Sequence, residues 1–132
     1  MADKIKVETI LIADDDLEIL ALVRRFLNKL EVGQIHEASD GEEALRAAKE
    51  HTPDLVILDV MMPGMSGWEV CRSIREDESL AKTAVIMLTG IGERLNEMTS
   101  PLYGADEYLD KPFEFGELEA KIRHALATRR GE

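Results

Sequence analysis

Polar and charged residues that could do chemistry stand at the ends of apolar runs in this chain. Asp14 and Asp15 directly follow one such run, and Asp59 ends another. A third run ends at Thr89, and Lys111 follows a fourth. In open sheets of parallel strands, ligands bind beyond the carboxyl ends of the strands. The sequence therefore predicts that these five side chains share one crevice.

The expected crevice is acidic. Asp14, Asp15 and Asp59 carry three negative charges and Lys111 one positive charge, which leaves a formal charge of −2. Carboxylates brought this close repel one another, so such a site either binds a proton or attracts a cation. The candidate ligands are oxygen atoms, with neither imidazole nor thiolate among them, and this set favours Mg²⁺ or Mn²⁺ over zinc or copper.

A magnesium site of this kind favours phosphoryl chemistry. Mg²⁺ takes few carboxylates and keeps several water positions, which a phosphoryl oxygen can occupy. A carboxylate can act as the nucleophile and carry the group as an acyl phosphate. The three oxygens of a transferred phosphoryl group need cations or hydrogen-bond donors, and the metal, Lys111 and Thr89 would supply them.

The elements that must position these residues alternate along the chain. Buried apolar runs predict strands, and amphipathic spacing predicts helices. We expect strands at residues 9–13, 34–38, 55–58, 84–88 and 107–109, and helices at 17–30, 40–51, from 67, from about 93, and at 114–127.

Three helix starts have capping signals. Asp16 is a suitable N-cap for the first helix. Ser39 with Glu42, and Ser66 with Glu69, have the spacing of capping boxes. The first helix should bury one apolar face, made of Leu17, Leu20, Ala21, Phe26, Leu27 and Leu30. Pro101 should make the fourth helix short or irregular, because proline disrupts a helix interior.

Five strands alternating with five helices imply parallel strands joined by right-handed crossovers. We therefore expect an α/β fold, a three-layer α/β/α sandwich. The 132 residues fit one domain, without a repeat, a low-complexity segment or a linker that would mark an internal boundary.

Composition excludes several classes of function. Sixteen basic and 27 acidic residues give a formal charge of −11, which disfavours direct binding to nucleic acid. The apolar runs fall far short of the roughly 20 residues of a membrane-spanning helix. The single cysteine, Cys71, cannot form an intramolecular disulfide, which fits a reducing compartment. We expect a cytoplasmic protein without membrane insertion.

The chain resembles the receiver domain of bacterial two-component response regulators from about residue 8 to residue 127. Four segments in order carry this resemblance: Ile12-Ala13-Asp14-Asp15-Asp16, Leu58-Asp59-Val60-Met61-Met62-Pro63-Gly64-Met65-Ser66-Gly67, Met87-Leu88-Thr89-Gly90 and Tyr108-Leu109-Asp110-Lys111-Pro112-Phe113. The resemblance implies a flavodoxin-like five-stranded parallel sheet of order 2-1-3-4-5.

The resemblance also implies roles for single residues. Asp59 matches the phosphoacceptor and Lys111 the lysine that pairs with the phosphoryl group. Thr89 matches the switch hydroxyl, and Tyr108 the aromatic whose rotamer follows phosphorylation. The metal ligands would be Asp14, Asp15, Asp59 and the backbone carbonyl of Met61, and Lys111-Pro112 would be a cis peptide.

The function so implied is a stand-alone receiver, residues 1–132, without an effector domain. A histidine kinase or a histidine phosphotransfer protein would donate the phosphoryl group, and phosphorylation would switch binding to a downstream protein that the sequence does not identify. The chain would not be an enzyme, although it would support its own phosphorylation and autodephosphorylation. Met61 and Ile91 are apolar residues at the expected rim, so we predict a long-lived phosphorylated state.

Two other functions are alternatives to this interpretation. A magnesium-dependent phosphatase with an aspartyl nucleophile would carry a general acid two residues after it, where this chain has Met61. An interaction module that is not phosphorylated would have a disrupted acidic pocket, whereas Asp14, Asp15 and Asp59 are all present.

Overall fold

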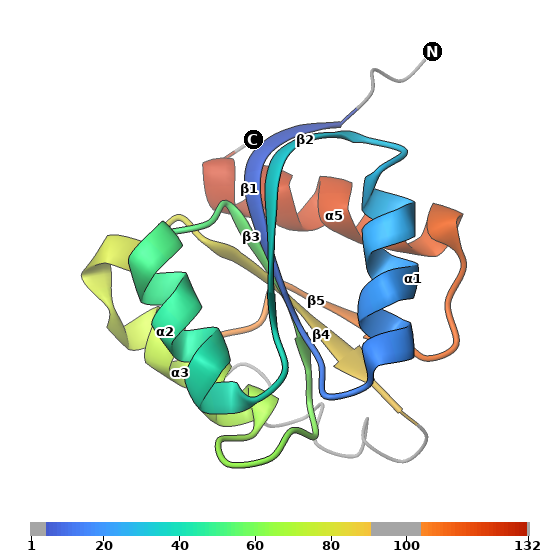
Figure 1. The fold of residues 1–132 in the computed structure, drawn as a ribbon. Helices are drawn as coiled ribbons and strands as arrows, with labels where there is room; N and C mark the ends of the chain where they lie inside the picture. Colours follow the sequence, from blue (N-terminus) through green and yellow to red (C-terminus); the bar gives the residue numbers. More distant parts are fainter. Residues whose placement is uncertain (1–4, 91–103, 132) are drawn as a thin grey trace.

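A five-stranded parallel sheet forms the centre of the computed structural model, which describes residues 5–90 and 104–131 (Figure 1). The strand order is β2-β1-β3-β4-β5, which confirms the predicted order. The strands are β1 (Lys6–Ala13), β2 (Glu31–Ala38), β3 (Leu55–Asp59), β4 (Ala84–Thr89) and β5 (Glu107–Asp110).

Helices cover both faces of this sheet, as expected for a three-layer sandwich (Figure 1). The helical segments are α1 (Leu17–Leu27), α2 (Gly41–His51), α3 (Gly67–Glu76), the short 3₁₀ helix η1 (Glu78–Leu80) and α5 (Phe115–Arg130). The helix expected from about residue 93, with Pro101, lies outside the described residues.

The core consists of two apolar layers, because successive side chains of a strand point to opposite faces. Ile12 and Ile57 lie in the layer that α1 and α5 cover. Leu11 and Val56 lie in the layer that α2 and α3 cover. Every residue of β3 and β4 is buried, as expected of strands covered on both faces.

The first helix differs from the prediction. α1 ends at Leu27, and its buried residues are Leu20, Val23 and Leu27. Leu17 is 73% exposed and Ala21 is also exposed, so the expected apolar face was wrong at these two positions. Leu20, Val23 and Leu27 lie on one face of α1. This face packs against the sheet, and the flank that carries Leu17 and Ala21 faces away from it.

The helix caps confirm two predictions and correct a third. Asp16 accepts a hydrogen bond from the Glu18 backbone N–H (2.9 Å), and Ser66 caps α3. For α2 the cap is Asp40 rather than Ser39, because the Asp40 carboxylate accepts a hydrogen bond from the Glu43 N–H at 2.8 Å. A capping box that the sequence reading missed, formed by Glu114 and Glu117, begins α5.

A close approach of α3 to the end of β3 depends on Gly67. A Cβ atom at Gly67 would lie 2.1 Å from the Asp59 carbonyl oxygen, far inside van der Waals contact. The Gly67 N–H donates a hydrogen bond to the Val60 carbonyl (2.8 Å). Glycine at this position therefore lets α3 begin directly beside Asp59.

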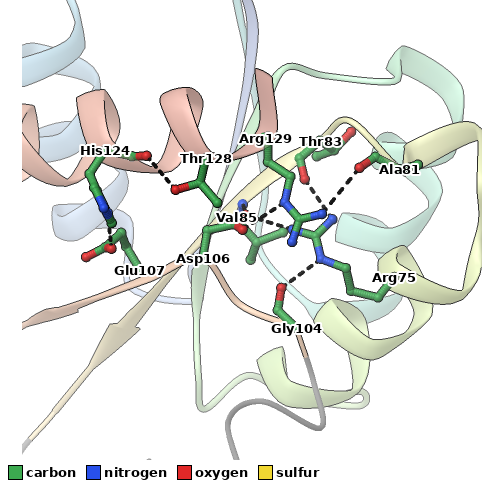
Figure 2. Close-up of polar contacts among 10 residues, drawn as sticks. All are labelled: Arg75, Ala81, Thr83, Val85, Gly104, Asp106, Glu107, His124, Thr128 and Arg129. Atoms are coloured by element: carbon green, nitrogen blue, oxygen red, sulfur yellow. Dashed lines mark hydrogen bonds and ion pairs between the residues drawn. The ribbon is translucent and has the colours of Figure 1, made fainter. Parts of the chain in front are cut away.

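A buried ionic cluster of Arg75, Asp106 and Arg129 joins α3, the residue before β5, and α5 (Figure 2). Asp106 accepts hydrogen bonds from Arg75 and Arg129, each at 2.7 Å, and from the Val85 N–H at 2.8 Å. Only 2% of the Asp106 side chain is exposed. Arg75 also donates to the Gly104 carbonyl (2.7 Å), so the cluster anchors the chain where it enters β5.

Among the described residues, no helix combines the length and the apolar character that crossing a lipid bilayer requires.

Candidate functional site

The carboxyl ends of four neighbouring strands bring the predicted residues together. Asp14 follows β1, Asp59 and Thr89 are the last residues of β3 and β4, and Lys111 follows β5. Because β1, β3, β4 and β5 are adjacent and parallel, these positions share one edge of the sheet. The backbone maintains this arrangement, since the Lys111 N–H donates to the Thr89 carbonyl at 2.7 Å.

Lys111 bridges two buried carboxylates. Its Nζ atom lies 2.8 Å from Asp59 Oδ1 and 3.1 Å from Asp14 Oδ2. The Asp14 and Asp59 side chains are 0% and 6% exposed, whereas Asp15 is exposed. One lysine therefore neutralises part of a site that holds two carboxylates away from water.

Burial changes the protonation equilibria of this pair of charges. Desolvation raises the pKa of Asp14 above its ordinary value, although a hydrogen bond from the Asp16 N–H (2.9 Å) and the charge of Lys111 oppose the change. Burial also acts to lower the pKa of Lys111, but the hydrogen bond and charge of Asp59 and the charge of Asp14 outweigh it. The net pKa of Lys111 is raised, so Lys111 is a cation at neutral pH.

The acidic residues fit a divalent metal ion. One carboxylate oxygen from each of Asp14, Asp15 and Asp59 lies within 4.8 Å of the other two. Asp14 Oδ2 is buried and has the ion-pair contact with Lys111 but no hydrogen-bond donor in suitable geometry. This set of hard oxygen ligands suits Mg²⁺ or Mn²⁺. Met61 follows two residues after Asp59, and the residue is 63% exposed.

Thr89 lies in the site with its hydroxyl bound to the neighbouring strand. The residue is buried, and its Oγ1 donates a hydrogen bond to Asp110 Oδ1 at 2.7 Å. Sequence reasoning missed Asp110. Thr89 and Asp110 are cross-strand neighbours in the β4–β5 register, and the apolar pattern of the sequence does not determine that register.

Tyr108, the expected switch aromatic, lies half-buried on β5. Its ring centroid is 6.1 Å from that of Trp68 on α3, with the two planes tilted by 46°. The Lys111-Pro112 peptide bond is cis, as expected from the resemblance. Ile91, the second expected rim residue, lies outside the described residues.

Comparison with known proteins adds independent evidence. The family model for the response regulator receiver domain matches residues 10–123. The "Probable transcriptional regulator ycf27" of Guillardia theta is 42% identical over 119 residues, which cover 90% of this chain and 45% of that protein. The transcriptional regulatory protein ResD of Bacillus subtilis is 41% identical over 117 residues, which cover 89% of this chain and 47% of ResD.

Solved structures agree with this match. A response regulator receiver domain protein from Clostridium thermocellum has a TM-score of 0.84 at 32% identity, with coverage of 94% of this chain and 98% of that one. The chain spans about half the length of the two curated relatives above.

Proposed function

Because the chain belongs to the family of response regulator receiver domains, we propose that Asp59 is a phosphoacceptor that takes a phosphoryl group from a phosphohistidine. The donor would be a histidine kinase or a histidine phosphotransfer protein. The observation that carries the proposal is the contact of Lys111 Nζ with Asp59 Oδ1, at 2.8 Å, inside a cluster of three carboxylates. A cation at this distance can stabilise the charge of a phosphoryl group on Asp59.

The transfer proceeds by attack of an Asp59 carboxylate oxygen on phosphorus. The P–N bond of the donor breaks, its electron pair stays on the imidazole nitrogen, and that nitrogen is neutral or takes a proton from solvent. The product is an acyl phosphate. Water attack on the phosphorus later releases inorganic phosphate and regenerates Asp59. The chain thus supports its own phosphorylation and autodephosphorylation and is not an enzyme with a separate substrate.

Mg²⁺ is the metal that we assign to the acidic cluster, with Mn²⁺ as a possible replacement. Asp14, Asp15, Asp59 and the backbone carbonyl of Met61 would hold it. When bound, the metal supplies positive charge to the phosphoryl oxygens. The buried Asp14 carboxylate supports this assignment, because its Oδ2 atom lies 3.1 Å from Lys111 Nζ and accepts no hydrogen bond from the described residues.

The output that we assign to the site is a change of protein partner. The Thr89 hydroxyl and the Lys111 ammonium interact with the phosphoryl group in one of two conformations, so phosphorylation shifts the population towards that conformation. Tyr108 changes its rotamer with this shift. The unit that switches spans about residues 8–127, a range that the family match over residues 10–123 supports. A formal charge of −11 favours a protein partner over direct contact with nucleic acid.

We place the protein in the cytoplasm. Cys71 is its single cysteine and is buried without a disulfide, as is usual in a reducing compartment. Burial raises the pKa of the Cys71 thiol to about 12, so the thiol stays protonated and unreactive.

Intact mass measurement tests the proposed function. The protein is incubated with acetyl phosphate and MgCl₂, alone or with excess EDTA. Wild type should gain one phosphoryl group when Mg²⁺ is present, and Asp59→Asn should gain none. Asp54→Asn is a matched control, because Asp54 lies just before β3, at the far end from Asp59. A phosphoryl group on Asp59→Asn, or none on wild type, would contradict the proposal.

A further inference from the structure

The hydroxyl hydrogen of Thr89 is already in use in this structure. Thr89 Oγ1 lies 2.7 Å from Asp110 Oδ1, and its next acceptor, the Leu109 carbonyl, is 3.4 Å away. Thr89 is 1% exposed, whereas Asp110 is exposed at the end of β5. The shorter bond is charge-assisted, because a carboxylate accepts it, and such bonds are about twice as strong as neutral ones.

A threonine hydroxyl has one hydrogen to donate. When Thr89 donates to Asp110, it has none left for a phosphoryl oxygen on Asp59. From this competition we propose that Asp110 is a positioning residue that holds the Thr89 hydroxyl against β5 and so opposes the phosphorylated conformation. This inference rests on the proposed role of Asp59 and adds a regulating residue to the same site.

The backbone around this bond favours a switch made by side-chain rotation alone. Thr89 and Asp110 are paired residues of β4 and β5, and the Lys111 N–H bonds to the Thr89 carbonyl at 2.7 Å. Lys111 Nζ contacts Asp59 and Asp14, at 2.8 and 3.1 Å. Thr89 can therefore exchange Asp110 for a phosphoryl oxygen while the strand register is unchanged.

Beryllofluoride, a non-covalent analogue of the phosphoryl group, provides the test. Its affinity is measured in the presence of MgCl₂ for wild type, Asp110→Asn and Asp110→Ala. The alanine variant should bind roughly ten-fold more tightly, the gain expected when one competing charge-assisted hydrogen bond is removed. The asparagine variant should fall between alanine and wild type, because its amide oxygen is a neutral acceptor.

A second set of variants separates the hydrogen bond from the charge of Asp110. In a Thr89→Val background the competition no longer exists, so Asp110→Ala should change the affinity by less than about 1.5-fold. Glu107→Gln is the charge control, since it removes one negative charge from β5, where Glu107 pairs with Lys121 rather than with Thr89. It should leave the affinity for beryllofluoride close to that of wild type.

The unliganded protein gives an independent readout. The Thr89 methyl resonance should shift in Asp110→Ala without any ligand, because the hydroxyl loses its acceptor. The role of Asp110 would be overturned by an unchanged affinity in Asp110→Ala, or by the same gain in affinity from Asp110→Ala in the Thr89→Val background as in wild type. Either result would leave the proposed function of Asp59 standing. If wild type fails to bind beryllofluoride and gains no phosphoryl group from acetyl phosphate, the proposed function fails and the role of Asp110 fails with it.

Discussion

Lys111 forms ion pairs with two carboxylates that are almost completely buried. Its Nζ atom contacts Asp59 Oδ1 at 2.8 Å and Asp14 Oδ2 at 3.1 Å. A metal ion at the acidic cluster would compete with Lys111 for the same charges. The Lys111→Met variant should therefore bind Mg²⁺ several-fold more tightly at pH 7, as measured by calorimetric titration, because the cluster loses its own cation.

Lys121→Met is the matched control for that titration. Lys121 lies on α5 and pairs with Glu107 at 3.0 Å. Glu107 is the first residue of β5, whereas the acidic cluster lies at the carboxyl ends of the strands. Its removal should leave the affinity for Mg²⁺ unchanged. Equal or weaker Mg²⁺ binding in Lys111→Met would show that Lys111 does not compete with the metal.

Met61 tests the prediction of a long-lived phosphorylated state. Its side chain is exposed two residues after Asp59 and carries no group that can orient an attacking water. In Met61→Asn, loss of the phosphoryl group should be several-fold faster, as followed by mass after removal of acetyl phosphate. Leu17→Asn, at a second large apolar residue that is exposed, should decay like wild type. An unchanged or slower decay in Met61→Asn would refute the prediction.

Most residues of the site could be predicted from the sequence, because the end of a strand is easy to recognise. Asp59 ends an uninterrupted apolar run, and Lys111 precedes a proline. The hydrogen bond of Thr89 to Asp110 could not be predicted in the same way. It depends on side-chain rotamers and on the register of β4 and β5, which a pattern of apolar residues does not determine.

The start of α3 makes a prediction about packing between elements. In Gly67→Ala, the new methyl group would meet the Asp59 carbonyl oxygen at 2.1 Å, and backbone atoms cannot move aside cheaply. Urea unfolding should show a loss of about 2–3 kcal/mol. Gly116→Ala is the control, because nothing lies within 4 Å of its Cβ position on α5, and it should gain up to about 1 kcal/mol. Equal stabilities of the two variants would contradict the close approach of α3 to β3.

The ionic cluster at the start of β5 should be a major stabilising contact between elements (Figure 2). In Asp106→Asn, Arg75 and Arg129 would remain close together without their shared carboxylate. Removing one partner of a buried ion pair costs about 3–5 kcal/mol, and the partial exposure of Arg129 places the expected loss at the lower end.

The exposed pair of Arg72 and Glu76 provides the comparison for this cluster. Both side chains are mostly exposed and lie 3.8 Å apart on α3. Glu76→Gln should therefore change the free energy of unfolding by less than about 0.5 kcal/mol. A loss below about 1 kcal/mol in Asp106→Asn would show that the buried cluster is not a strong contact.

The types and order of the elements were more predictable than the residues at which the strands begin. Long apolar runs identify β3 and β4 because these strands are buried on both faces. β1 and β2 begin at Lys6 and Glu31, earlier than expected. The two strands already pair at these polar residues, which an apolar pattern does not identify as strand. The cluster of Arg75, Asp106 and Arg129 joins residues 23 to 31 positions apart, a distance over which charge patterns carry no information.

At the scale of the whole molecule, burial of the Asp14 carboxylate should lower stability at neutral pH. Desolvation raises the pKa of Asp14 above its ordinary 3.8. The folded state then binds this proton more tightly than the unfolded state does, so the contribution of Asp14 is fully present below about pH 3.8 and is lost as pH rises through the higher pKa of the folded state. Asp14→Asn should therefore raise the thermal midpoint at pH 7, and the gain should disappear as pH falls towards 3.8.

Magnesium should reverse that difference. Wild type should be stabilised by added MgCl₂, because the metal binds the folded state alone, and Asp14→Asn should respond much less. Thermal unfolding at several pH values, with and without MgCl₂, measures both effects. A gain in Asp14→Asn that does not depend on pH would contradict the assigned cost of burying the Asp14 carboxylate.

We propose that the fold places one carboxylate, that of Asp59, where it can carry phosphorus. Chemical location of the modified residue tests this most directly. Protein treated with acetyl phosphate and MgCl₂ is reduced with borohydride, which converts an aspartyl phosphate to homoserine, and is then sequenced by mass spectrometry. Homoserine is expected at position 59 and at no other position. Homoserine at Asp14 or Asp15, or a phosphoryl group that resists reduction, would contradict the proposal.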